Sequence, residues 1–244
     1  PIKSSAASDV YKRQFIGKVG NDIFGRQLKA VVREAGINTD GLVTDESVNT
    51  TLAFVHTLPG GDREFSFYRN PGADMMLSES DIDYKLVQNS RIFHFGSLSM
   101  TGEICEAATK KAVETAKESG AIISFDPNLR ENLWDSLDKA REKIAYGISE
   151  CDILKISDNE IQWFTGEQDF DRAVEILRGR YGNIKLLLLS LGKNGSRAYC
   201  GENSAFAPAV PANTIETTGA GDTFCGGILA KVLEYGLRLS LIHI

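Results

Sequence analysis

The segment ETTGAGDTFCGG places a glycine-rich turn and one carboxylate directly before a helical pattern. The apolar residues after the turn recur at the spacing of one helix face, at Phe224, Ile228, Leu229, Val232 and Leu233. A helix is therefore predicted to begin near Ala220. Its first amide groups lack intrahelical partners and carry the positive end of the dipole, so Gly219, Ala220 and Gly221 would let a phosphate approach bare backbone. Asp222 would repel that phosphate and is better suited to accept a proton.

A purely structural interpretation of this turn is also open, because small residues commonly form the turn before a helix and acidic residues in a first turn commonly only complement the dipole. The elements around it favour a site. From residue 90 onward, strand-like runs at 91–95, 121–126, 152–157 and 185–190 alternate with helical patterns. This alternation predicts an α/β fold with a mostly parallel sheet covered on both faces.

Polar clusters follow several of these predicted strands. SFDPNLR ends one strand with Asp126, Asn128 and Arg130, and KISDNE ends the next with Ser157 and Glu160. LLSLGKNG ends a third, and ETTGAGD precedes the last helix. Each cluster alone is also typical of a turn, a helix cap or a hairpin. Four on the carboxyl edge of one sheet favour a ligand site there.

Residues 40–70 do not follow the alternating pattern. TLAFVHT and EFSFY flank LPGGDR, which predicts a β-hairpin. A hairpin added to an α/β body is typical of a lid or an oligomer contact, and a purely structural role is equally open.

Composition narrows the class of protein. The 244 residues are 42% hydrophobic and 25% charged with a net charge of −6, and no block of consecutive Lys or Arg points to nucleic acid or a membrane surface. The four cysteines show no CxxC spacing, so neither zinc nor a disulfide framework is indicated and a reducing cytoplasm is expected. The longest apolar run is too short to span a bilayer, and no signal peptide is evident.

Both ends of the chain differ in character from the rest. PIKSSAASDVYKRQ at 1–14 and LRLSLIHI at 237–244 lack periodicity and adjoin predicted elements abruptly. We expect both to be non-native segments that flank one domain at 15–236, with the hairpin inserted at about 40–70.

The clusters together suit transfer of a phosphoryl group to a hydroxyl. Asp222 would accept the hydroxyl proton, and the amides of the glycine-rich turn would stabilise the charge on the transferring group. Mg2+ would bridge the nucleotide phosphates, with Glu160 the best-placed carboxylate to hold it through water. GKNGS does not match a P-loop, and Phe224 replaces the last glycine of a G-x-G-x-x-G motif, so other nucleotide-binding motifs are disfavoured.

Several longer segments resemble one enzyme family. ETTGAGDTFCGG, GKVGNDIFG, REFSFYRNPGADMML, FGSLS, DPNLRENLW and LKISDNEIQWFTG are similar to segments of the ribokinase-like, phosphofructokinase-B type carbohydrate kinases, closest to fructokinases. The match covers about residues 15–236. It implies a three-layer α/β/α sandwich in which the hairpin is a substrate lid and a candidate homodimer contact.

The resemblance also implies roles for residues, position by position. Asp222 matches the catalytic base, and Gly219, Ala220 and Gly221 match the anion hole. The implied substrate-binding positions are Arg69, Asn70, Asn128 and Arg130. The implied nucleotide-binding positions are Ser157, Ser190, Gly192, Gly219 and Gly221. Glu160 matches the Mg2+ position, and Glu216 and Thr218 fall near a monovalent-cation (K+) loop.

The expected reaction is therefore ATP-dependent phosphorylation of a sugar, with O6 of fructose as acceptor. One alternative is the same chemistry on 2-keto-3-deoxygluconate, whose carboxylate Arg130 would meet. The other is an inert fragment that binds sugar or nucleotide. The expected partners are ATP, Mg2+ and a sugar, and neither nucleic acid nor a membrane.

Overall fold

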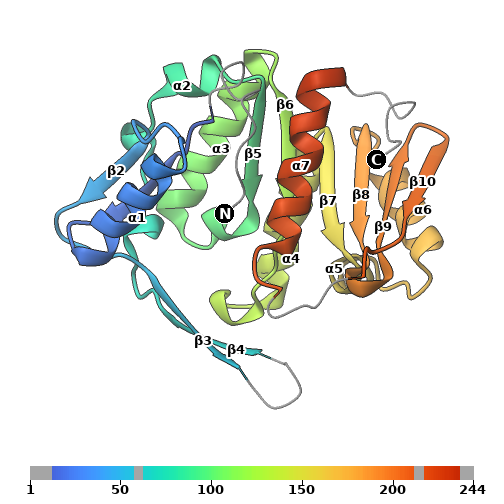
Figure 1. Cartoon of the computed structure of the whole chain (residues 1–244), viewed down its shortest axis with the longest axis horizontal. Coiled ribbons are helices and arrows are strands. Elements are labelled where there is room, and N and C mark those ends of the chain that lie inside the picture. The colour runs from blue at the N-terminus through green and yellow to red at the C-terminus, as the bar shows by residue number, and fades with distance from the viewer. Residues whose placement is uncertain (1–12, 58–62, 212–216, 237–244) are drawn as a thin grey trace. The chain divides into compact units, whose positions relative to one another are not determined.

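The structure is a computed structural model that describes residues 13–57, 63–211 and 217–236 (Figure 1). The expected terminal segments lie outside these ranges, apart from residues 13 and 14. The chain divides into two compact units. Unit 1 comprises Pro1–Gln88 and Ser99–Ala112, and unit 2 comprises Asn89–Leu98 and Val113–Ile244.

Unit 2 is built on a six-stranded sheet in the order β10-β9-β8-β7-β6-β5. The four strands β5 to β8 are parallel, whereas β9 and β10 continue the sheet antiparallel. Their bounds are β5 Ile92–Gly96, β6 Ile122–Asp126, β7 Ile153–Ser157, β8 Leu186–Ser190, β9 Ser196–Cys200 and β10 Asn203–Ala207. The predicted α/β fold with a mostly parallel sheet is confirmed, and GKNG forms the turn between β8 and β9.

Helices cover both faces of this sheet (Figure 1). The parallel strands follow one another in chain order, so right-handed crossovers place α4 and α6 on one face. The last helix, α7, lies on the other face. The helix bounds are α3 Glu103–Glu118, α4 Leu137–Glu150, α5 Asp158–Thr165, α6 Phe170–Arg180 and α7 Ala220–Tyr235, with short 3-10 turns η4 Ser97–Met100, η5 Glu131–Leu133 and η6 Gly192–Asn194.

The apolar stripe of α7 packs on the sheet as its spacing predicts. Val232 is buried against side chains of β7, β8 and β9, and Phe224, Ile228 and Leu229 pack partly buried beside it. The strand residues of this cluster are Ile153, Leu186, Leu188 and Ala198. Because β7 and β8 are buried on both faces, their sequences are almost continuously apolar.

Unit 1 contains a short parallel pair, β1 Gly17–Gly20 with β2 Leu42–Asp45. The connecting helix, α1 Ile23–Glu34, begins at Asp22, whose Oδ1 accepts the Gly25 N–H at 2.8 Å. Asp22 Oδ2 also accepts the Thr50 N–H at 2.7 Å, so one carboxylate both caps the helix and fixes a distant loop. The remaining elements are η2 Ala73–Met76, η3 Glu79–Asp81 and α2 Tyr84–Gln88.

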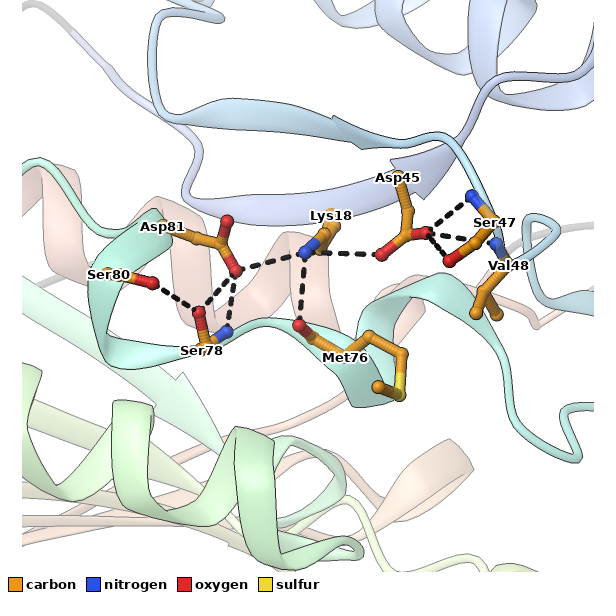
Figure 2. Close-up of polar contacts among 8 residues, drawn as sticks. All are labelled: Lys18, Asp45, Ser47, Val48, Met76, Ser78, Ser80 and Asp81. Atoms are coloured by element: carbon orange, nitrogen blue, oxygen red, sulfur yellow. Dashed lines mark hydrogen bonds and ion pairs between the residues drawn. The ribbon is translucent and has the colours of Figure 1, made fainter.

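An ion cluster ties these segments of unit 1 together (Figure 2). Lys18 Nζ lies 3.2 Å from Asp45 Oδ2 and 3.0 Å from Asp81 Oδ2, and donates to the Met76 carbonyl at 3.2 Å. The Lys18 side chain is only 12% exposed. Burial alone would lower the pKa of Lys18, but the two carboxylates outweigh it and raise that pKa. One cation therefore joins β1, β2 and the 3-10 turns.

The predicted hairpin is confirmed: β3 Leu52–Thr57 pairs antiparallel with β4 Arg63–Tyr68 and projects as an arm from its unit (Figure 1). Residues 42–45, which fall within the expected insertion, pair instead with β1. In the part of the chain that the structure describes, no helix is long and apolar enough to cross a bilayer.

Candidate active site

On the sheet face that α7 covers, side chains change from apolar to polar toward the carboxyl ends of the parallel strands. Pairing places Ile153 beside Leu186, and two residues further on Lys155 beside Leu188. Another two residues further on, Ser157 pairs with Ser190. On β6 the same face carries Ser124 and then Asp126. The first turn of α7 lies against this polar edge, since Lys155 Nζ would be 3.1 Å from a Cβ at Gly221.

Helix α7 begins at Ala220, as the sequence predicts. Gly219 is the N-cap of α7 in the left-handed region, with φ 77°, where a side chain would be strained. Its carbonyl accepts the Thr223 N–H at 2.8 Å, and the Thr217 carbonyl accepts the Ala220 N–H at 3.1 Å. Asp222 lies in the first turn and its side chain is exposed. The turn and the carboxylate are thus adjacent, and their chemical roles remain predictions.

A buried ion pair lies beneath this turn. Lys155 Nζ is 2.9 Å from Asp126 Oδ2 and 3.1 Å from Oδ1, and both side chains are at most 7% exposed. Burial raises the pKa of Asp126 to about 6, although the ammonium opposes the rise. Burial would lower the pKa of Lys155, but the Asp126 carboxylate outweighs it and the pKa is raised. Lys155 therefore stays charged inside the protein.

Glu160 and Ser157 form a capping box at the start of α5, so the helix-cap interpretation of SDNE holds as geometry. Glu160 Oε2 accepts from the Ser157 N–H at 2.9 Å and from its hydroxyl at 2.7 Å. The other oxygen, Oε1, accepts the Leu129 N–H at 2.7 Å. One carboxylate thus holds the loop after β6 beside the loop after β7.

The other predicted residues of unit 2 lie on loops at the same edge. Asn128 has a positive φ of 45° and is half-buried. Arg130 Nη1 donates to the Leu129 carbonyl at 3.0 Å. Ser190 ends β8, and Gly192, with φ 53°, opens the turn to β9. The sheet therefore brings Asn128, Arg130, Ser157, Glu160, Ser190 and Gly192 to one edge.

Arg69 and Asn70 belong to unit 1, at the base of the hairpin. Arg69 Nε and Nη2 lie 2.8 and 2.6 Å from Asp74 Oδ2, and Nη1 donates to the Thr101 hydroxyl at 2.7 Å. Asp74 also accepts from the Thr51 hydroxyl. Asn70 is exposed and precedes a cis peptide bond to Pro71. Arg69 is thus anchored by its own unit.

For the predicted cation sites, Thr218 is exposed in the turn before α7, and Glu216 lies outside the described residues. Among the residues with described positions, no group of three or more His, Cys, Asp or Glu side chains could hold a metal ion by itself.

Sequence reasoning missed Lys155 as a residue of this edge. A signal was present, because the strand ILKIS carries a lysine in an otherwise apolar run that is buried on both faces. Ser124 was missed as well; its hydroxyl lies 2.9 Å from His94 Nδ1. A serine within a strand gives no comparable signal.

Comparisons with known proteins find similarity to carbohydrate kinases. The profile of the family described as "pfkB family carbohydrate kinase" matches residues 6–241. Fructokinase-1 of Oryza sativa subsp. japonica is 41% identical over 220 residues, which cover 90% of this chain and 68% of that protein.

Solved structures agree. A Xylella fastidiosa fructokinase with bound ATP superposes with a TM-score of 0.83 at 31% identity, covering 91% of this chain and 68% of that one. The Vibrio cholerae O395 fructokinase with fructose, ADP and calcium bound gives a TM-score of 0.85 at 28% identity, covering 94% of this chain and 72% of that one. The similarity extends over both units of the chain.

Proposed function

The chain belongs to the pfkB family of carbohydrate kinases, and on that premise we propose that it transfers the γ-phosphoryl group of ATP to O6 of fructose. The observation that carries the proposal is Asp222 beside the left-handed Gly219 turn at the start of α7. Supporting similarities are to fructokinases, one of them with fructose and ADP bound.

In the proposed reaction Asp222 accepts the proton of the sugar hydroxyl as its oxygen attacks the γ-phosphorus. The new O–P bond forms as the bond to the β-phosphate oxygen breaks, and ADP leaves. The amides of Gly219, Ala220 and Gly221 would stabilise the developing charge, and for this the Ala220 N–H would have to exchange its bond to the Thr217 carbonyl for one to the phosphate. The exposure of Asp222 allows a substrate hydroxyl to reach it.

Glu160 fits a Mg2+ site in which water lies between the carboxylate and the metal. Each oxygen of Glu160 already accepts at least one hydrogen bond, yet a carboxylate offers about four lone-pair sites in total. Mg2+ keeps several waters and uses one or two carboxylates plus phosphates, so Glu160 would hold it through water. When bound, the metal neutralises charge on the phosphates. A K+ site at Glu216 and Thr218 remains part of the proposal.

Within unit 2, Asn128 and Arg130 are the proposed sugar contacts, and they follow β6 next to the first turn of α5. Within unit 1, Arg69 and Asn70 stay predicted substrate-binding residues: Asp74 fixes the Arg69 guanidinium, and Asn70 is exposed. An acidic sugar such as 2-keto-3-deoxygluconate would instead need Arg130 to pair with its carboxylate.

Dimerisation and location are further parts of the proposal. The hairpin exposes Phe54, Val55 and Tyr68, and a two-stranded arm alone is marginally stable, which favours pairing with a second copy. All four cysteines are free thiols, which suits a reducing cytoplasm. We propose that the kinase domain comprises residues 15–236.

The test is ADP release by the purified chain with MgATP and a panel of acceptors. We expect fructose to give the highest kcat/KM and its product to carry phosphate on O6, established by NMR. ADP release with 2-keto-3-deoxygluconate and with no other acceptor would mean that the acidic sugar is the substrate of the same reaction. ATP binding without release for any sugar would favour the inert fragment and contradict the proposal.

A further inference from the structure

The buried pair of Lys155 and Asp126 lies directly under the first turn of α7. A Cβ built on Gly221 would be 3.1 Å from Lys155 Nζ and 3.6 Å from Cε, so the ammonium is in contact with the turn predicted to seat phosphate. Lys155 extends from the middle of β7, whose other side chains are apolar apart from Ser157 at its end. The position of the charge is therefore fixed by the sheet.

This placement is unfavourable for folding alone. The first turn of a helix carries partial positive charge, and a cation there is normally destabilising. Burying both ions of the pair adds a desolvation cost that their attraction offsets only in part. A pair of apolar side chains would suit the interior at least as well, so the arrangement indicates a use for positive charge at this point.

The surrounding carboxylates indicate what that use is. Glu160 and Asp222 both act on the electrostatics of Asp126, and Glu160 acts on Lys155. A triphosphate that enters beside three carboxylates meets repulsion, and a buried ammonium is screened far less by salt than a surface one. Lys155 supplies such a charge without any movement of its side chain.

We propose, resting on the function proposed above, that Lys155 is a positioning residue of the phosphoryl-transfer site: its ammonium, held by Asp126 against Gly221, sets the affinity of the α7 turn for the phosphates of ATP. Asp126 keeps the ammonium in place and does not touch the substrate. The pair thus serves the turn above it rather than the stability of the sheet.

The test compares Lys155→Met, Asp126→Asn and the double variant with the wild type. Each is measured for thermal unfolding midpoint, for MgATP affinity by calorimetry and for turnover with fructose. The single Lys155→Met variant leaves a buried carboxylate without its partner and should melt earlier. The double variant leaves no unpaired buried charge, so its midpoint should recover toward the wild-type value.

The affinity for MgATP shows whether the ion pair contributes to nucleotide binding or is only structural. We expect Lys155→Met and the double variant to bind MgATP on the order of tenfold more weakly than wild type, and Asp126→Asn to bind at least as tightly as wild type. A double variant with recovered midpoint and wild-type affinity would overturn the proposal, because the pair would then be only structural.

Two further arms keep the result interpretable. Should the double variant not fold, Lys155→Arg, which retains the charge, is compared with Lys155→Met; an equal loss of affinity in both contradicts the proposal. Should wild type bind MgATP but not turn over fructose, the proposed function fails while the affinity comparison still decides the role of Lys155.

Discussion

The two aspartates nearest the glycine-rich turn have different environments, and this difference supports different roles. Asp126 is 4% exposed and paired with Lys155, whereas Asp222 is exposed in the first turn of α7. A carboxylate held by a buried ammonium is poorly placed to collect a proton from a substrate. Asp222 is open to solvent and could approach a hydroxyl, so its exposure as well as its spacing supports the proposal that it is the base.

Glu160→Gln tests the assignment of the Mg2+ carboxylate. We expect the Mg2+ concentration for half-maximal activity to rise on the order of tenfold, because the amide has lost the charge that orients metal-bound water. Titration of activity with Mg2+ at fixed ATP measures it.

The matched control for that variant is Glu167→Gln. Glu167 Oε1 also accepts two backbone N–H groups, from Gln168 at 2.8 Å and Asp169 at 3.1 Å, but it lies beyond the end of α5. Its Mg2+ requirement should match that of the wild type. If both variants share the wild-type requirement, Glu160 has only its capping role.

At the scale of elements, the start of α7 depends on a backbone that only glycine adopts readily. Gly219→Ala places a side chain at φ 77° and should lower the free energy of unfolding by about 1–2 kcal/mol. It should also reduce kcat strongly, because the strained turn would displace the amides that we propose bind phosphate. Urea unfolding and steady-state turnover measure the two effects.

Gly120→Ala is the control, since Gly120 has φ 78° and open space around its Cβ position at the end of α3. It should incur a similar strain and leave kcat unchanged. Equal losses of kcat in the two variants would mean that only stability had changed.

The Lys18 cluster makes a prediction about stability and pH. Lys18→Met leaves Asp45 and Asp81 facing each other without their cation and should lower the free energy of unfolding by about 1–3 kcal/mol at pH 7. The Ser47 N–H bond and Lys18 hold the pKa of Asp45 below its usual 3.8. At Asp81, burial would raise the pKa, but hydrogen bonds from Ser78 and Lys18 outweigh burial and lower it.

Carboxyls with a lowered folded-state pKa stabilise the protein above their unfolded pKa, and that stabilisation is lost as pH falls through the folded pKa. Wild type should therefore lose more stability than Lys18→Met between pH 5 and about pH 3. Urea unfolding at the two pH values measures this. Lys110→Met, which breaks a half-exposed i,i+4 pair with Glu106, should show the wild-type dependence, and an identical loss in Lys18→Met would contradict the account.

The elements that were predicted from the sequence have a strong pattern of apolar residues. Strands β6 to β8 are mostly apolar and buried, β5 is mostly apolar but only partly buried, and α7 carries an apolar stripe that packs on the sheet. Strands β9 and β10 were missed, because SRAYC and NSAFA mix small, polar and aromatic residues and owe their pairing to the adjacent edge of β8.

The positions of the candidate site residues were partly predictable. Glycines and acids at strand ends predict a polar edge, and Glu160 and Asp222 do lie in the first turns of α5 and α7, while their chemical roles stay predictions. It could not show that Glu160 Oε1 binds Leu129, or that Arg69 is held by Asp74, because these contacts join segments that only the fold brings together. The contact between Lys155 and Gly221 could not be predicted either, because it depends on the register of the strands in the sheet.

At the scale of the whole molecule, the hairpin is the surface that we expect to join two copies. Phe54 is 57% exposed on β3, and its ring packs edge-on against Tyr68 at 5.4 Å. Phe54→Asp should therefore shift the protein toward monomer in sedimentation equilibrium, because the charge would have to be buried in the interface.

Phe206→Asp is the matched control, since Phe206 is 58% exposed on β10. It should leave the association state unchanged. A wild-type protein that stays monomeric at micromolar concentration would contradict the proposed dimer, and dimers in all three proteins would move the contact away from the hairpin.

The most direct test of the central claim is turnover of Asp222→Asn set against its affinity for ATP. The account predicts that kcat with fructose falls by about 100-fold or more, because the proton acceptor is lost, while calorimetry gives MgATP affinity at or above that of the wild type. Comparable kcat in the two proteins would contradict Asp222 as the base beside the phosphate-binding turn of α7.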